Sequence, residues 1–323
     1  MTKKWKKAIA LSLAALTLTG ALAGCGDDKK AASGAAKPAA GQTIKINFPT
    51  AGASGALYAV GAAITNMWSS QVPGVQASSQ ASAGGIANLN MVSEGEAQVS
   101  IAISSNVYQC LNGTDSFKDH AYKDLKAIGG LYLNPNQVVA TANSGINSLK
   151  DVKGKHFAVA SAGSSVYNEC ETHFTAAGLS FPDDIKAEYI TFTDAADMLQ
   201  NGSIDGAWIM SGAPASAVTQ ALTGGAHLVE IDDTLIKELK AKYPWYTSYT
   251  IKAGTYPNQD KDVKTSAIKM VMFCRGDLPE DVVYQLTKTL WEHMDELGQS
   301  QKNLKGLTAE NAVKDIADIP LHP

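Results

Sequence analysis

The side chains that could bind a small molecule are hydroxyls in short loops of small residues. The clearest loop is PTAGASGALY, which ends at Tyr58; Thr50 and Ser54 add hydroxyl donors there, and Gly55 lets backbone approach a ligand. Small residues that open a helix expose its first N–H groups and its partial positive charge, and both favour an anion. The loop matches neither GxGxxG nor GxxxxGK[ST], so a nucleotide site is not indicated. A glycine-rich turn that only packs a helix on a sheet is the structural alternative.

Four more loops of this composition each follow a β-rich run. Their sequences are SAGGIAN, SSN, SAGSS and SGAP, and they begin at Ser82, Ser104, Ser161 and Ser211. In open parallel sheets, ligands bind where strands end and helices begin, so we predict that these loops line one cleft. N-capping is a compatible structural role for the same side chains. The candidate donors are Thr50, Ser54, Asn88, Ser104, Ser105, Asn106, Ser161, Ser164 and Ser165.

Composition excludes several classes of function. Without residues 1–24, which hold four lysines and no acid, 23 basic side chains face 31 acidic ones, and nucleic-acid binding is not expected. Arg275 is the single arginine, so an anion site must be built without the usual guanidinium clamp. Cys110, Cys170 and Cys274 lack CxxC spacing and are expected to be buried free thiols, with a Cys110–Cys170 bridge as the alternative. No cofactor and no metal site is expected.

The first 24 residues have the layout of an export signal. A lysine-rich start precedes an apolar run, Ala8–Ala23, which is too short and wrongly flanked for a spanning helix. The sequence LAGC that ends at Cys25 resembles a bacterial lipobox, in which the cysteine is acylated and becomes the new N-terminus. An ordinary signal peptide with a chance cysteine is the alternative. Residues 26–42 resemble a flexible tether, so we expect an extracytoplasmic protein anchored to the membrane through Cys25.

The elements that must position the loops alternate from Thr43 onward. Short β-rich runs and helical runs follow one another, which indicates a mostly parallel sheet covered on both faces. The pattern begins again near residue 138, while the last strand and helix are expected to return to the first unit. We predict two α/β lobes with a ligand cleft between them: lobe I of 43–137 plus 252–323, and lobe II of 138–251, joined by crossing strands near Gln137–Ala142 and Tyr249–Gly254.

Over residues 43–323, the order and spacing of these segments resemble the solute receptors of the TAXI branch of tripartite ATP-independent periplasmic (TRAP) transporters. The segments that carry the resemblance are the opening loop with Tyr58, AGG with Asn88-Leu89, EGEA from Glu94, SSNV from Ser104, LKDVKGK from Leu149 with Gly163-Ser164, GSIDG from Gly202, GAP from Gly212, GTY from Gly254 and IPLHP from Ile319.

The resemblance implies a type II periplasmic-binding-protein fold, whose two lobes close on a small carboxylate such as glutamate or another organic acid. It also implies delivery to a sodium-coupled TRAP membrane permease. The implied ligand contacts are Ser54, Gly55, Tyr58, Gly85, Ser104, Ser164, Ser165 and Gly212. Two features depart from the family: Asn106 stands where an aspartate is frequent, and the chain stops at Pro323 where many members continue.

Three alternatives accompany this reading. A substrate-binding lipoprotein of an ABC importer has similar lobes and a similar anchor. A surface adhesin would neither close nor hold a small ligand. A serine-type enzyme would use Ser266 and Lys269, which match the SxxK spacing of penicillin-recognising enzymes. That motif needs a helix, whereas the apolar run that follows favours a strand, and no KTG or SDN companion is present; we therefore expect a binding protein and no enzyme.

Overall fold

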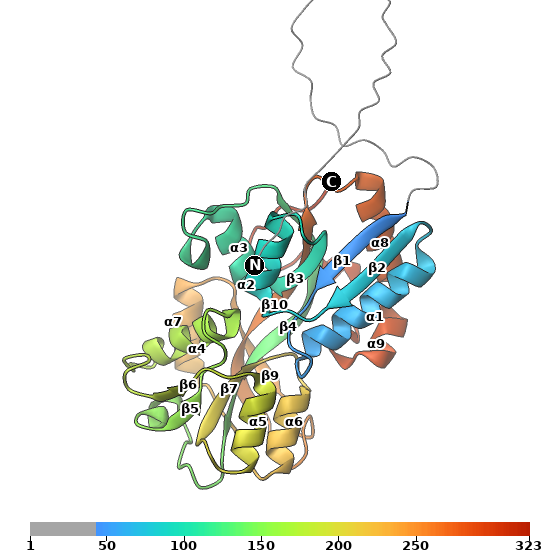
Figure 1. Ribbon diagram of the computed structural model, residues 1–323. Helices are drawn as coiled ribbons and strands as arrows, with labels where there is room; N and C mark the ends of the chain where they lie inside the picture. Colours follow the sequence, from blue (N-terminus) through green and yellow to red (C-terminus); the bar gives the residue numbers. More distant parts are fainter. Residues whose placement is uncertain (1–42) are drawn as a thin grey trace, which may run out of the picture. The chain divides into compact units, whose positions relative to one another are not determined.

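A computed structural model describes residues 43–323 (Figure 1). Cys25 and the expected tether lie outside the described residues. The strands are β1 (Ile44–Pro49), β2 (Val75–Gln80), β3 (Val99–Ile103), β4 (Leu125–Ala140), β5 (His156–Ala158), β6 (Lys186–Glu188), β7 (Gly206–Met210), β8 (His227–Val229), β9 (Tyr246–Ile251) and β10 (Val263–Arg275).

The helices confirm the expected α/β alternation. They are α1 (Ala56–Gln71), α2 (Gly85–Ser93), α3 (Ser104–Asn112), α4 (Ser165–Ala176), α5 (Phe192–Gln200), α6 (Ser216–Thr223), α7 (Asp233–Lys242), α8 (Glu280–Glu292), α9 (Met294–Ser300) and α10 (Ala309–Ala312), with 3-10 turns η1 (Asp115–Phe117), η2 (Leu149–Val152) and η3 (Lys302–Leu304). Among the described residues, none of these helices combines the length and apolarity needed to cross a bilayer.

Two sheets organise the strands. β1 and β2 pair in parallel, and α1 connects them. The larger sheet has the order β3-β10-β4-β7-β5-β6, with β8 also paired to β4 and β9 to β10. Helix α1 forms as its 3.6-residue apolar period predicts, because Leu57, Val60 and Ile64 all turn into the core. β3 is buried at every position, as its continuous apolar run predicts.

The long strands β4 and β10 run side by side through both halves of the described chain (Figure 1). The first part of β4 pairs with β10, and its last part pairs with β7 and β8. β10 pairs first with β9 and then with β3. The mixed α/β class with two lobes is therefore confirmed, whereas the residue boundaries of the lobes stay a prediction. The expectation of a mostly parallel sheet is wrong, because β10 pairs antiparallel with β3, β4 and β9, and β4 pairs antiparallel with β7 and β8. Parallel pairs form where a helix connects the two strands, as α1 does for β1 and β2 and α4 for β5 and β6.

β4 begins at Leu125, well before the extended segment expected from Val138. Its sequence contains Gly129-Gly130 and Pro135, which are turn signals in isolation. Tertiary packing favours glycine in this strand: a Cβ on Gly130 would lie 2.7 Å from Lys269 Cε and 3.0 Å from Ile316 Cγ2, so both side chains would have to shift. The register between β4 and β10 also shifts beside Gly130, between Lys269 and Val271.

Three buried cysteines, Cys110, Cys170 and Cys274, are free thiols in the described part of the chain, which confirms the expectation for them. Burial raises the pKa of the Cys110 thiol to about 11 and that of Cys274 to about 12. These thiols therefore stay protonated and serve as small apolar core residues.

Candidate functional site

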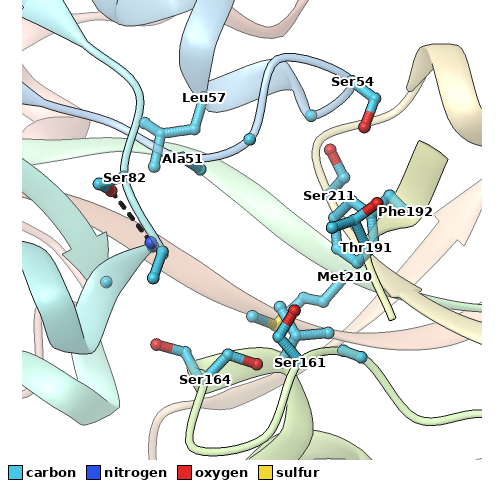
Figure 2. Close-up of a pocket in the computed structure, with 18 of the residues that line it drawn as sticks. Ala51, Ser54, Leu57, Ser82, Ser161, Ser164, Thr191, Phe192, Met210 and Ser211 are labelled. Carbon is cyan, nitrogen blue, oxygen red and sulfur yellow. Dashed lines mark hydrogen bonds between the residues drawn. The ribbon is translucent and has the colours of Figure 1, made fainter. Parts of the chain in front are cut away.

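A cavity of 480 Å³ lies where the predicted loops meet, between elements of the two halves (Figure 2). The start of α1 contributes Ser54 and Gly55, and the start of α2 contributes Gly84 and Gly85. On the other side, α4 and α5 begin at the same space. Their N-cap residues, Ser164 and Thr191, both line it.

Several helix N-termini thus converge on one cavity. One such end contributes roughly 0.3–1 kcal/mol toward an anion when exposed and up to about 2 when partly buried. The backbone N–H groups of a first turn have no intrahelical acceptor, so those that no capping side chain already bonds are available to a ligand. Hydroxyls of Ser54, Ser161 and Ser211 lie around the same space (Figure 2). The arrangement can bind a negative group without a positively charged side chain.

No charged side chain of the described residues lines this cavity. The single arginine, Arg275, instead pairs with Asp277 through its Nε, 2.8 Å from Oδ1. Apolar side chains complete the wall and come from several elements: Leu57, Ile103, Val166, Ile190, Phe192, Met210 and Met270. A suitable guest therefore combines a polar or anionic group with an apolar body.

Two adjacent serines at the start of α4 differ in their hydrogen bonding. Ser164 Oγ accepts a hydrogen bond from Tyr167 N at 3.1 Å, so it caps the helix. Ser165 is only 5% exposed, and its Oγ has no partner in the described part of the chain. A Cβ on Gly85 would approach Ser165 Oγ to 3.0 Å and Asn106 Oδ1 to 3.5 Å. A side chain on Gly85 would therefore crowd two polar atoms that have no hydrogen-bond partner in the described part of the chain.

Alanine substitution should separate these serines. We expect Ser165→Ala to weaken ligand binding about tenfold and to leave unfolding of the free protein unchanged, because its hydroxyl has no protein partner to lose. Ser164→Ala should cost about 1 kcal/mol of unfolding free energy, since it removes a helix cap. Calorimetric titration and chemical denaturation measure the two effects. Loss of stability in Ser165→Ala with intact affinity would contradict the assignment.

Hydrogen bonds join the region where α1 begins to the segment that leads from β7 into α6, beside the cavity. The first N–H of α1, on Ala56, donates to Ser211 Oγ at 3.0 Å, although the residues are 155 positions apart. Ser216 Oγ donates to Ser54 O at 2.7 Å. A serine from the second half therefore caps a helix of the first half.

The cavity brings together six of the thirteen predicted binding residues: Ser54, Gly55, Gly85, Ser161, Ser164 and Ser165. Thr50 and Asn88 lie behind its wall. Thr50 Oγ1 donates to Gln80 O at 2.6 Å, while Asn88 Nδ2 donates to Thr50 O at 2.7 Å and to Ile101 O at 3.1 Å. These bonds hold the first two loops in place, so both residues position the site.

The remaining predicted residues lie outside the wall of this cavity. Tyr58 is 37% exposed, and Ser104 is buried. Ser105 and Asn106 border a second cavity. Gly212 sits against another chain segment, since a Cβ there would lie 2.6 Å from Asn303 Oδ1. Their ligand contacts stay predictions.

Thr191, Phe192 and Thr193 line the cavity but were not predicted from the sequence. Thr191 Oγ1 accepts a hydrogen bond from Asp194 N at 3.2 Å and caps α5. The available signal was the T-x-x-D spacing after a β-rich run, which is typical of a capped helix start.

A buried polar network lies outside this cavity and joins α4 to the two long strands. His173 Nδ1 donates to Glu169 O at 2.7 Å, which leaves Nε2 to accept from Ser266 Oγ at 2.7 Å. Burial raises the pKa of the Glu169 carboxyl to about 8 and lowers the pKa of His173 to about 4. Although His173 Nδ1 lies 3.9 Å from a Glu169 carboxyl oxygen, both side chains are therefore neutral at pH 7.

The same network bears on the serine-enzyme alternative. Ser266 is fully buried in β10, and Asn136 Nδ2 donates to its Oγ at 3.0 Å. Lys269 lies on the same strand, and its Nζ donates to Asn311 O at 2.9 Å. A strand cannot place side chains three positions apart on one face, so the SxxK geometry is not formed.

The chain matches the model of the NMT1-like family over residues 48–323. Three solved structures share its fold. A periplasmic transporter has a TM-score of 0.57 at 17% identity and covers 86% of this chain and 92% of its own. The periplasmic binding protein BugD has a TM-score of 0.55 at 15% identity, and the match covers 86% of this chain and 91% of BugD. The alkanesulfonate-binding protein SsuA from Xanthomonas axonopodis pv. citri, bound to MOPS, has a TM-score of 0.50 at 16% identity, with 82% and 79% covered.

Proposed function

We propose that this chain, which belongs to the NMT1-like family, is an extracytoplasmic solute-binding protein that captures a small carboxylate and delivers it to a membrane permease. The observation that carries the proposal is the uncharged cavity at which the helices α1, α2, α4 and α5 begin. Such a site can hold a ligand, and the described residues that line it include no nucleophile–base pair, so we propose binding without catalysis.

The size and chemistry of the cavity support the ligand class. Its 480 Å³ lies within the usual range for small-molecule sites, and no carboxylate lines it to repel an anion. The apolar wall suits the carbon chain of an organic acid. The MOPS-bound SsuA structure adds a relevant precedent, because MOPS carries a sulfonate on an organic body. Alkanesulfonates are therefore the comparison ligands in the test below.

Carboxylates of about four to six carbon atoms should raise the melting temperature of residues 43–323. A ligand at a hundred times its dissociation constant stabilises the folded state by about 2.7 kcal/mol. Thermal denaturation with amino acids, dicarboxylates, keto acids and alkanesulfonates measures this effect. Stabilisation by sugars or cations alone would refute the ligand class, and stabilisation by sulfonates alone would replace the carboxylate.

We further propose that this solute-binding protein is the receptor of a TAXI-type TRAP transporter and is anchored through a lipid on Cys25. This proposal rests on the resemblance of the loops and on the lipobox-like sequence. Solute uptake by cells that carry the protein should then require a sodium gradient, and mass spectrometry should find a diacylated Cys25 at the N-terminus. Uptake that requires ATP instead would identify the ABC-importer alternative.

A further inference from the structure

A second cavity, of 680 Å³, lies on the other side of α4. Ser165 and Val166 border the first cavity, whereas Asn168, Glu171 and Thr172 border the second. The helix therefore separates two spaces with different linings. The second space is bounded by α3 and η1 on one side and by α4, α7 and the start of β9 on the other.

The second cavity has a negatively charged lining, which does not suit an anion. Asp115, Glu171 and Glu238 line it, and none of the three has a basic partner within ion-pair distance in the described part of the chain. Among the described residues that line it, Lys242 is the single basic one. The excess of carboxylates favours a cation.

Aromatic rings form one wall of this cavity. Tyr243 and Trp245 stack with their ring centroids 5.3 Å apart. Lys242 Nζ lies 5.1 Å from the Tyr243 centroid and occupies that ring face, so a ligand ammonium group must bind away from it, nearer the carboxylates. An alkyl chain can pack on the remaining aromatic surface.

An unsatisfied hydroxyl supplies an independent observation. Ser105 lines the cavity and is 1% exposed, and its Oγ has no hydrogen-bond partner in residues 43–323. A buried hydroxyl without a partner costs about 1–3 kcal/mol, which a ligand bearing a hydrogen-bond donor would recover. A quaternary ammonium has no N–H and cannot donate to this oxygen.

We propose that the second cavity binds a primary organic ammonium ion. Its N–H groups would donate to Ser105 Oγ and to the surrounding carboxylates, and its alkyl chain would pack on Tyr243 and Trp245. A bound ion would contact both sides of the second cavity. Asn168 on α4 already links these sides, because its Nδ2 donates to Ser116 Oγ on η1 at 2.9 Å.

Titration with n-butylammonium chloride, followed through the indole N–H resonances, tests the proposal on residues 43–323 at constant ionic strength. We expect saturable binding that perturbs the Trp245 signal. Glu171→Gln and Glu238→Gln should each weaken it about threefold and together about tenfold. Ser105→Ala should weaken it about fivefold. Glu94→Gln removes one exposed carboxylate outside this cavity and is the matched control.

A comparison of two ammonium ions distinguishes binding at this site from general attraction to acidic surface. Tetramethylammonium should bind more weakly than n-butylammonium, because it cannot donate a hydrogen bond. The proposal would be overturned if n-butylammonium showed no saturable binding, or if Glu94→Gln lowered its affinity as much as Glu171→Gln does. Equal binding of the two ammonium ions that is insensitive to Ser105→Ala would also overturn it.

Discussion

Replacing Ser161 with aspartate should weaken binding of a carboxylate ligand about a hundredfold. Ser161 lines the first cavity on the loop before α4, and its side chain lies beside that space (Figure 2). Two like charges about 6 Å apart repel by roughly 3 kcal/mol at an effective dielectric of about 20. Calorimetric titration of the wild-type ligand measures the loss.

Ser161→Asn is the matched control, because it has nearly the same shape and no charge. It should retain affinity within about threefold. Neither variant should lower stability greatly, since Ser161 is exposed. Tighter binding by the aspartate variant would show that the ligand is a cation, and unchanged binding would place the ligand elsewhere.

Replacing Glu169 with glutamine should remove the fall in stability that this carboxyl causes as pH rises from about 4.5 to about 8. Burial raises the pKa of this carboxyl from 4.5 to about 8 in the folded protein. Between these values the unfolded chain releases the proton and the folded chain keeps it, so stability falls as pH rises. The difference corresponds to an effect on the order of 3–4 kcal/mol by pH 8.

The surroundings of Glu169 explain why glutamine should fit. Tyr246 Oη donates to Glu169 Oε2 at 2.7 Å, and burial raises the pKa of that phenol, which keeps it a donor. A glutamine amide oxygen can accept the same hydrogen bond from Tyr246, and it carries no charge to bury.

Urea denaturation across pH 5 to 9 measures the effect. The variant should exceed the wild type in stability at the alkaline end. Glu169→Gln should lose stability as pH falls from 6.5 toward 4.5, because burial lowers the pKa of His173 to about 4 and the unfolded chain then binds the proton more readily. In the wild type the opposite contribution of Glu169 over the same range should offset this loss. Glu171→Gln, an exposed change on the same helix, should keep the wild-type profile. Parallel curves for wild type and Glu169→Gln would contradict a neutral Glu169.

Much of the fold could be predicted from local patterns. The apolar period of α1 and the continuous run of β3 identify those elements, because each buried face repeats within a few residues. The long strand β4 could not be found in this way. Its glycines and proline indicate a turn, and they form a strand because β4 pairs with the distant strands β10, β7 and β8.

The candidate site, too, could be predicted from the sequence only in part. Local sequence identified loops of small hydroxyl residues at helix starts and the absence of a basic clamp, because these depend on residue type and order. Only tertiary structure decided which polar groups are satisfied. Asn88 bonds to Ile101 O, Ala56 N bonds to Ser211 Oγ, and Ser165 Oγ remains without a partner in the described chain. Hydrogen bonds between distant segments determine whether a side chain supports the cavity or faces a ligand, and sequence spacing does not specify them.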